Sequence, residues 1–476
     1  QLLLALWLLL QSMGGDIEVY RLGNWAAPFG IVLMLDRLAA LMLVLAGVLG
    51  LVIQLYAIGS GWDRRGRHFH ALWQFQLMGI NGAFLTGDAF NLFVLFEILL
   101  IASYGLMIHA GGELRLRAGV QYVVYNLLGS SLFLAGLGTL YAVTGTLNMA
   151  DMAAKIALLP AQDTALLRVG AVLLMLVFAV KAALVPLHFW LPATYARAPG
   201  PVAALFAIMT KVGIYGIIRF FTLVFPSDDA LMRLISDILL PAALVTLIVG
   251  QLGVLGARHM GRMTAFAAVG SVGTVMIAVA QFQPQGLAAG IWYLVHSTLA
   301  TAALFLAVDL IGTRRQGGSL WLRPAPPIAQ AGIVAALYFA AAIAMAGLPP
   351  LSGFLGKLAV LQSVREGDMT ALIWAVILIT SLFGIVGLTR AGSVVFWKAH
   401  EDGTPAPHAP DEPQPEEPGF PSAALALTSV GALVAAMVAL TVLAGPMMRF
   451  AEATAAQLTD PQPYIEAVLE RQEGVK

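Results

Sequence analysis

The sequence contains no cysteine and little charge. Among its 476 residues only 11% are Asp, Glu, Lys or Arg. The absence of cysteine excludes disulfides, thiolate metal sites and iron–sulfur clusters. Soluble proteins carry roughly 25% charged residues, whereas this chain is 59% hydrophobic with a mean hydropathy of +0.85. These values predict a polytopic membrane protein. The formal net charge is zero, which argues against a nucleic-acid partner.

Known motifs for cofactor chemistry are also missing. The sequence has no P-loop, no Rossmann fingerprint, no HEXXH motif and no cluster of metal ligands. The GSVG stretch from Gly270 to Gly273 indicates close helix contact rather than a phosphate-binding loop. We therefore expect no cofactor, no resident metal and no enzymatic reaction.

Long apolar runs divide the chain into membrane spans of about 20 residues each. Twelve full spans are predicted, at 29–57, 71–88, 89–109, 118–144, 166–190, 201–225, 238–257, 263–282, 287–312, 330–363, 371–397 and 421–447. The apolar run from Gln1 to Met13 is interpreted as the back half of a further span whose beginning lies outside this sequence. The predicted fold is thus an all-α polytopic membrane protein.

Basic residues in the loops between these spans predict the orientation, because cytoplasmic loops are rich in Lys and Arg. One alternate set of loops carries thirteen: Arg64, Arg65, Arg67, Arg115, Arg117, Arg197, Arg258, Arg262, Arg314, Arg315, Arg323, Arg390 and Lys398. The opposite set carries four: Lys155, Arg168, Arg233 and Arg365. The first set should face the cytoplasm, and the segment after Gly445 should face outward.

We divide the chain into five parts. Residues 1–70 form the N-terminal helices, 71–225 a first five-helix repeat and 226–399 a second one. Residues 400–420 form a cytoplasmic loop rich in proline and acid, which is interpreted as a solvated spacer or, alternatively, a docking segment. Residues 421–476 form the last helix and a tail, where Tyr464 and Val468 have helical spacing.

Titratable residues inside these apolar spans cost several kcal/mol each, and such residues usually mark ion pathways. The candidates are Glu97, Lys181, Lys211, His296 and Lys357, with Asp36 and Arg37 nearer a helix start. A packing role needs one pair, whereas a proton path needs a chain of titratable groups on separate helices. The alternatives are a static Glu97–Lys181 ion pair and a simple interhelical hydrogen bond of His296.

Two of the lysines lie beside proline breaks. Pro186 follows Lys181 by five residues, and Pro349 and Pro350 precede Lys357. Proline removes a helical hydrogen bond and frees a backbone carbonyl, which is tolerated at membrane depth only beside protein or water. The two breaks are five to six spans apart. A five-helix unit reverses its orientation on repetition, which is the plan of many transporters.

Three stretches carry a resemblance to a known family: FNLFVLFEILLIASYGLM, VKAALVPLHFWLPATYARAPGPVAALFAIMTKVGIYGIIR and GLPPLSGFLGK. They resemble the proton-translocating antiporter-like membrane subunits, which occur in Mrp-type cation/proton antiporters, respiratory complex I and membrane-bound hydrogenases. The chain looks most similar to the D-type subunits of Mrp antiporters. Complex I subunits usually carry an acidic residue and a histidine after WLP, where this chain has Ala193, Thr194 and Tyr195.

The resemblance implies fourteen helices with two inverted five-helix repeats, so that about one and a half N-terminal helices are missing here. It also implies that Glu97 is the essential glutamate of the fifth helix. Lys181 and Lys357 match the lysines of two broken helices, Lys211 that of the eighth helix, and His296 a histidine of the eleventh. Other Mrp subunits are the implied partners, in a bacterial inner membrane.

From these observations we predict a subunit that exchanges Na+ or K+ for protons. Protons pass along Lys211, His296 and Lys357 between two aqueous half-channels. The Glu97–Lys181 ion pair forms and breaks, and the resulting change in charge biases the pKa of Lys211. The alternatives are a proton-pumping subunit of an NADH:quinone oxidoreductase or membrane-bound hydrogenase, and a scaffold that transports nothing.

Overall fold

The computed structural model describes residues 1–160, 164–315, 319–367, 369–399 and 423–469. The predicted loop at 400–420 lies outside these residues. Within them, ten helical stretches are long and apolar enough to cross a membrane. These are α2 (Arg37–Ser60), α4 (Ala89–Met107), α5 (Glu113–Thr144), α7 (Ala165–Ala182), Gly200–Val224, α11 (Asp229–Gly256), α12 (Met260–Val279), α13 (Pro284–Arg314), Thr370–Trp397 and α17 (Ala423–Val442).

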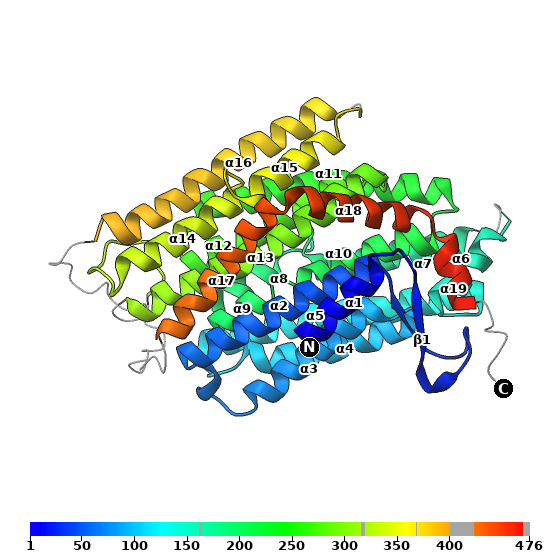
Figure 1. Cartoon of the computed structure of the whole chain (residues 1–476), viewed down its shortest axis with the longest axis horizontal. Helices are drawn as coiled ribbons and strands as arrows, with labels where there is room; N and C mark the ends of the chain where they lie inside the picture. Colours follow the sequence, from blue (N-terminus) through cyan, green and yellow to red (C-terminus); the bar gives the residue numbers. More distant parts are fainter. Residues whose placement is uncertain (161–163, 316–318, 368, 400–422, 470–476) are drawn as a thin grey trace.

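The other two predicted spans are a shorter helix and a broken one. The span at 71–88 is α3 (Phe69–Leu85), and the span at 330–363 is α14 (Ala331–Ala346) followed by α15 (Ser352–Ser363). The N-terminal run forms α1 (Leu2–Ser12). The helices pack side by side along one diagonal direction (Figure 1), so the predicted helical membrane fold is confirmed.

Shorter elements complete the described chain. They are β1 (Glu18–Arg21), η1 (Leu22–Asn24), β2 (Val32–Leu35), η2 (Trp62–Arg64), α6 (Met149–Ala157), α8 (Trp190–Arg197), α9 (Gly200–Leu205), α10 (Met209–Arg219), η4 (Phe220–Val224), α16 (Thr370–Gly392), η6 (Ser393–Trp397), α18 (Ala444–Thr459) and α19 (Gln462–Leu469).

Several predicted boundaries were wrong, and two of them change the course of the chain. The helix expected from residue 29 begins only at Arg37, because β2 pairs antiparallel with β1 in a hairpin. The Asp36 carboxylate accepts a hydrogen bond from the Ala39 amide and caps this helix. The apolar residues of β2 continue directly into the apolar helix, so hydropathy alone merges them. Likewise α17 ends at Val442, and the chain continues as α18 rather than reaching residue 447 in one span.

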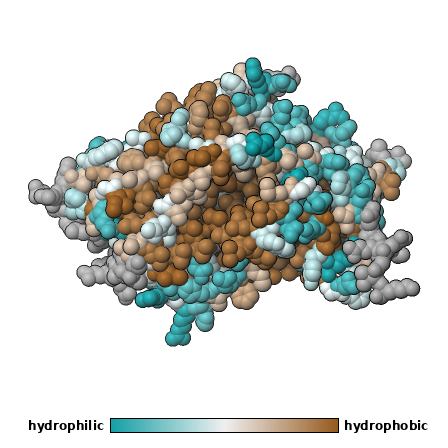
Figure 2. Space-filling model, in the orientation of Figure 1, coloured by the Kyte–Doolittle hydropathy of each residue, from teal (hydrophilic) through white to brown (hydrophobic). Residues whose placement is uncertain are grey.

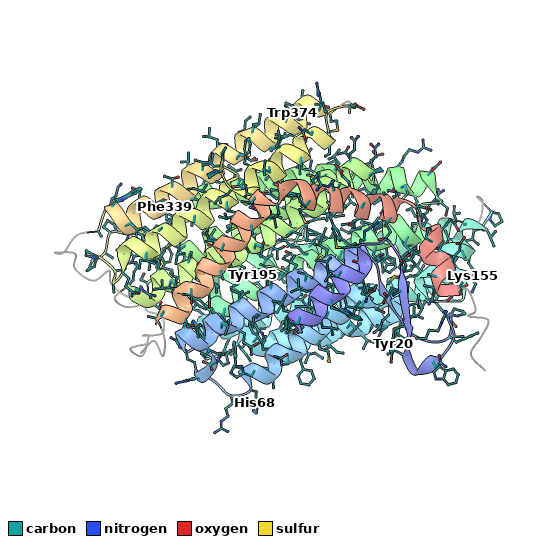
Figure 3. The ribbon with its side chains drawn as sticks, in the orientation of Figure 1. Tyr20, His68, Lys155, Tyr195, Phe339 and Trp374 are labelled. Atoms are coloured by element: carbon teal, nitrogen blue, oxygen red, sulfur yellow. The ribbon has the colours of Figure 1, made fainter. Side chains whose placement is uncertain are left out.

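The loops alternate between the two ends of the bundle. His68, from a basic loop, and Lys155, from an opposite one, lie at opposite ends of the molecule in Figure 3. Apolar side chains cover much of the face in Figure 2, and polar ones gather toward its margins. The predicted tail helix is confirmed as α19, and its Tyr464 and Val468 are buried.

The predicted proline breaks coincide with interruptions in the helices. Pro186 lies between the end of α7 and the start of α8, and Pro349 and Pro350 lie between α14 and α15. A third interruption was not predicted: a turn at residues 206–208 separates α9 from α10. There the hydroxyl of Tyr195, labelled near the centre of Figure 3, donates to the carbonyl of Phe206 at 2.8 Å. The Phe206 carbonyl thus has a side-chain partner at the point where the regular helical hydrogen bonding is interrupted.

Candidate functional site

Glu97 and Lys181 both contact polar side chains on one face of α5, because their partners Ser130 and Asn126 are four residues apart. Glu97 is half-buried in the middle of α4, and Lys181 is buried in the last turn of α7. The two side chains, both within the described chain, form no direct ion pair, since no nitrogen–oxygen distance between them is within 4.0 Å. They remain close enough for the carboxylate charge to act on the ammonium group.

Polar side chains of α5 fill the space between them. The Lys181 ammonium donates to the amide oxygen of Asn126 at 3.1 Å. One turn further, the hydroxyl of Ser130 donates to the Glu97 carboxylate. Gly129 lies between, and a Cβ built there would be only 3.7 Å from the Lys181 Nζ atom. The helix therefore connects the acid and the base through an amide, a hydroxyl and one turn of backbone.

Lys211 lies on α10, just after the unpredicted turn. Its side chain is fully buried, and its Nζ atom has no hydrogen-bond partner among the described residues. Buried polar groups are normally paired with protein or with ordered water. A charged ammonium left without any partner would be very costly, so this position indicates either a neutral amine or a hydrated one.

His296 and Lys357 lie on facing helices, α13 and α15. The imidazole Nδ1 of His296 is 2.9 Å from the Ser352 hydroxyl, in the first turn of α15. The Lys357 ammonium donates to the Ala346 carbonyl at the end of α14 and to the Ser381 hydroxyl of α16, both at 2.8 Å. The Ala346 carbonyl at the break in the helix thus accepts a hydrogen bond from Lys357.

The five candidate side chains come from five helices that follow one another through the bundle. In Figure 1 these helices run from α4 in the lower part of the view, past α7, α10 and α13, to α15 near the top. His296 lies within electrostatic reach of both Lys211 and Lys357. In the described part of the chain, no three His, Cys, Asp or Glu side chains are grouped closely enough to hold a metal ion.

The polar neighbours of these residues were not predicted from the sequence. Asn126, Ser130, Ser352 and Ser381 are ordinary in sequence, and only the packing of their helices shows what they contact. A different signal was available for Asp309, a carboxylate inside the apolar span of α13. It accepts from the Tyr56 hydroxyl at 2.7 Å and from the Trp62 indole at 3.0 Å.

Asp36 belongs to a buried ion pair. Its carboxylate binds both terminal nitrogens of Arg219, at 2.5 and 3.0 Å, and the guanidinium also lies over the ring of Tyr464 from α19. The adjacent Arg37 donates to the Met13 carbonyl at 3.0 Å. These contacts tie α2, α10 and the C-terminal segment together, so Asp36 and Arg37 anchor the start of α2.

Known proteins match this chain over most of its length. Residues 86–384 match the NADH:quinone oxidoreductase/Mrp antiporter transmembrane family. The chain belongs to this family. A relative from Rhizobium meliloti, named as the D subunit of a probable K(+)/H(+) antiporter, is 39% identical over 95% of this chain and 86% of the relative. A relative from Alkalihalophilus pseudofirmus, named as the D subunit of a Na(+)/H(+) antiporter, is 37% identical over 98% and 92%.

Solved structures agree with this assignment. A chain of the Mrp complex from Dietzia sp. superposes with a TM-score of 0.87 at 30% identity, covering 99% of this chain and 92% of that one. A chain of respiratory complex I from Thermus thermophilus gives a TM-score of 0.77 at 27% identity, covering 96% and 93%. The family member described here is thus a multi-pass membrane protein with the fold of these subunits.

Proposed function

We propose that the chain is the proton-translocating subunit of a multisubunit cation/proton antiporter in the bacterial inner membrane. It works beside other Mrp subunits and exchanges Na+ or K+ for protons at the expense of the proton-motive force. The observation that carries the proposal is the succession of titratable groups across five helices, four of them buried and Glu97 half-buried, next to relatives that are named as D subunits of antiporters. A membrane potential supplies roughly 2.3 kcal/mol per charge per 100 mV.

The Glu97 carboxylate and the Lys181 ammonium control the path. When the Lys181 side chain is turned toward Asn126, as in this structure, Glu97 is held by Ser130 instead. Rotation of Lys181 past Gly129 brings the two charges together, which draws positive charge away from Lys211. A buried lysine with fewer cationic neighbours holds its proton more easily. The proton on Lys211 thus responds to the Glu97–Lys181 contact.

Transfer then continues through His296. The charges of both Lys211 and Lys357 act on the imidazole. Its two nitrogens allow it to accept a proton on one side and release it on the other. Lys357 is the last group of the line. Its Ala346 and Ser381 partners can hold it in either protonation state, because a carbonyl accepts from an amine and a hydroxyl can donate to one.

Cation-dependent proton exchange in vesicles tests the function. In the intact complex, Glu97→Ala and Lys181→Ala should abolish exchange while assembly is retained. Glu113→Ala, which removes an exposed acid at the start of α5, is the matched control. Normal exchange by Glu97→Ala vesicles would refute the relay. Exchange that depends on a quinone or hydrogen donor rather than on Na+ or K+ would instead identify a redox-driven pump.

A further inference from the structure

Asp309 is an ionisable residue inside an apolar span that the proposed relay does not use. It lies on α13, five residues before that helix ends at Arg314. Its carboxylate accepts from the Tyr56 hydroxyl of α2 at 2.7 Å and from the Trp62 indole at 3.0 Å. It forms no ion pair within 4.0 Å with any described residue. Because a carboxylate is costly inside a membrane span, such a residue usually has a function.

The carboxylate lies against the first residue of α9, which together with α10 forms a broken helix. A Cβ built on Gly200 would overlap with the carboxyl carbon and the Oδ1 atom of Asp309. Glycine lets the carboxylate approach the backbone here, because it has no side chain. The whole of α9 packs against α13 and α2 (Figure 1), which carry the carboxylate and one of its donors. Asp309 thus supports the start of the broken helix.

Contacts outside α9 hold one donor of this carboxylate in place. The Trp62 carbonyl accepts from the His109 imidazole at 2.8 Å. The Arg115 guanidinium donates to the His109 carbonyl and to the Arg197 carbonyl, both at 2.9 Å. Arg197 ends α8, directly before the chain enters α9. The contacts therefore form a closed ring, which runs from α13 through the neighbouring loops and back to the start of α9.

The far end of the same broken helix is held by charge. Arg219, the last residue of α10, is paired with Asp36, which fixes α10 to the start of α2. Lys211 lies between the two supports, three residues after the turn at 206–208. Its Nζ atom has no hydrogen-bond partner among the described residues. Because no such bond fixes the amine, its position follows from that of the backbone.

We propose that Asp309 is a positioning residue for the proton carrier Lys211. Its carboxylate holds α9 in place, and the short turn at 206–208 transmits that position to the start of α10 and so to the Lys211 amine. The two supports differ, because Arg219 is part of α10 and is bonded ionically, whereas α9 contacts Asp309 by close packing at Gly200. The α9 end is therefore the one that a change at the carboxylate displaces. This inference rests on the proposed function, which assigns the proton to Lys211.

Amide hydrogen exchange tests the support of α9 independently of transport. Asp309→Ala would be made in the intact purified complex and followed by mass spectrometry over residues 200–211. We expect several-fold faster amide exchange in α9 and the turn, because a segment that loses packing opens locally more often. Asp237→Ala, at an exposed acid of α11, should leave it unchanged. Unchanged amide exchange in Asp309→Ala would overturn the support. If Asp309→Ala fails to assemble, Asp309→Asn, which keeps the shape but loses one acceptor oxygen, replaces it.

Gly200→Ala tests the effect on transport while the carboxylate is retained. The added methyl group overlaps with Asp309 and displaces α9, and a displacement of about 1 Å can cost about a hundredfold in rate. Cation/proton exchange should fall by about tenfold or more, and its pH profile should shift, since the surroundings of a buried amine set its protonation. Gly332→Ala, in the first turn of α14, adds a methyl group where nothing lies within 4 Å and should change neither. An unshifted pH profile in Gly200→Ala would overturn the link to Lys211, even if the rate is lower.

The double variant Gly200→Ala/Asp309→Ala decides whether the two residues act through one contact. Without the carboxylate the added methyl group has no obstacle at Asp309, so the double variant should lose about as much cation/proton exchange as Asp309→Ala alone. Losses that multiply would show that Asp309 does not act through α9, which overturns the proposal. The proposed function is decided separately by Lys211→Met. If that variant transports normally, the relay fails, whereas the amide hydrogen exchange of Asp309→Ala still decides whether the carboxylate supports α9.

Discussion

Lys181 and Lys357 each lie beside a broken helix, yet their surroundings differ. Lys181 precedes its break, at the end of α7, and has Glu97 within electrostatic reach. Lys357 follows its break, inside α15, and is held by a carbonyl and a hydroxyl, both neutral. The first lysine can therefore gain or lose an ionic partner, whereas the second can only exchange neutral hydrogen bonds.

This difference assigns separate tasks to the two regions. Pairing or unpairing a charge changes the electrostatic energy of neighbouring charged groups by several kcal/mol in a poorly solvated interior. The region around Lys181 is therefore suited to control, and the region around Lys357 to holding a proton. Lys211 and His296 connect them, and the Lys211 amine has no hydrogen-bond partner within the described chain.

The largest loss of exchange is expected at Lys211, which connects the two regions. Lys211→Met should reduce exchange by about a hundredfold or more, because a positioned acid–base group contributes about 10²–10⁴-fold. The complex should remain at least as stable, since an unpaired buried amine is replaced by an apolar side chain of similar length. Cation-dependent proton exchange in vesicles measures the loss of activity, and the melting temperature of the purified complex measures its stability.

Lys155→Met is the control for this variant, because Lys155 lies on the surface in an ion pair with Asp151. It should change neither quantity. If Lys211→Met exchanges at the wild-type rate, the two regions are not connected through this residue, and the buried lysines belong to a scaffold.

A smaller effect is expected in the control region. Ser130→Ala removes a hydrogen bond to the Glu97 carboxylate, and bonds to charged groups contribute about 1.5–3 kcal/mol. Exchange should fall by about tenfold, since each 1.4 kcal/mol is a factor of ten. Ser131→Ala is the neighbouring control, because Ser131 is exposed and bonds only to the Leu127 carbonyl. Equal rates for the two variants would remove α5 from the control region.

The matching change around Lys357 should matter less. Ser381→Ala removes one of two neutral partners and leaves the Ala346 carbonyl in place. A neutral hydrogen bond contributes about 1 kcal/mol, so exchange should fall only a few-fold. Thr428→Ala, on an exposed face of α17, provides the control. A loss as large as that of Ser130→Ala would contradict the distinction between the regions.

Much of this comparison could be predicted from sequence, for a physical reason. Charges and prolines inside apolar spans are costly enough to stand out, so the five titratable residues and both breaks were noticed, although Asp309 inside α13 was overlooked. The β1–β2 hairpin was missed because its apolar strand has the same hydropathy as the helix that follows. Asn126 and Ser130 were missed because a neutral polar residue in a membrane helix costs little, and its importance depends on which helix packs beside it.

The smallest effect at neutral pH is expected at His259, where the chain passes from α11 to α12. Its ring nitrogen accepts from the Arg262 amide and caps α12. Burial, together with the nearby Arg197 and Arg262 guanidinium groups, lowers the pKa of His259 to about 4 from its usual 6.5. The unfolded chain therefore binds the proton first as the pH falls, so this contribution to stability is present above pH 6.5 and is lost between pH 6.5 and 4.

His259→Asn keeps a good capping residue that does not titrate. At pH 7.5 its melting temperature and exchange should match the wild type. At pH 5 the wild type should have lost on the order of 2 kcal/mol that the variant retains, since one pKa unit corresponds to about 1.4 kcal/mol. His68→Asn, at an exposed position, should leave the pH dependence unchanged. If both variants follow the wild-type curve, acid destabilises the protein elsewhere than at the start of α12.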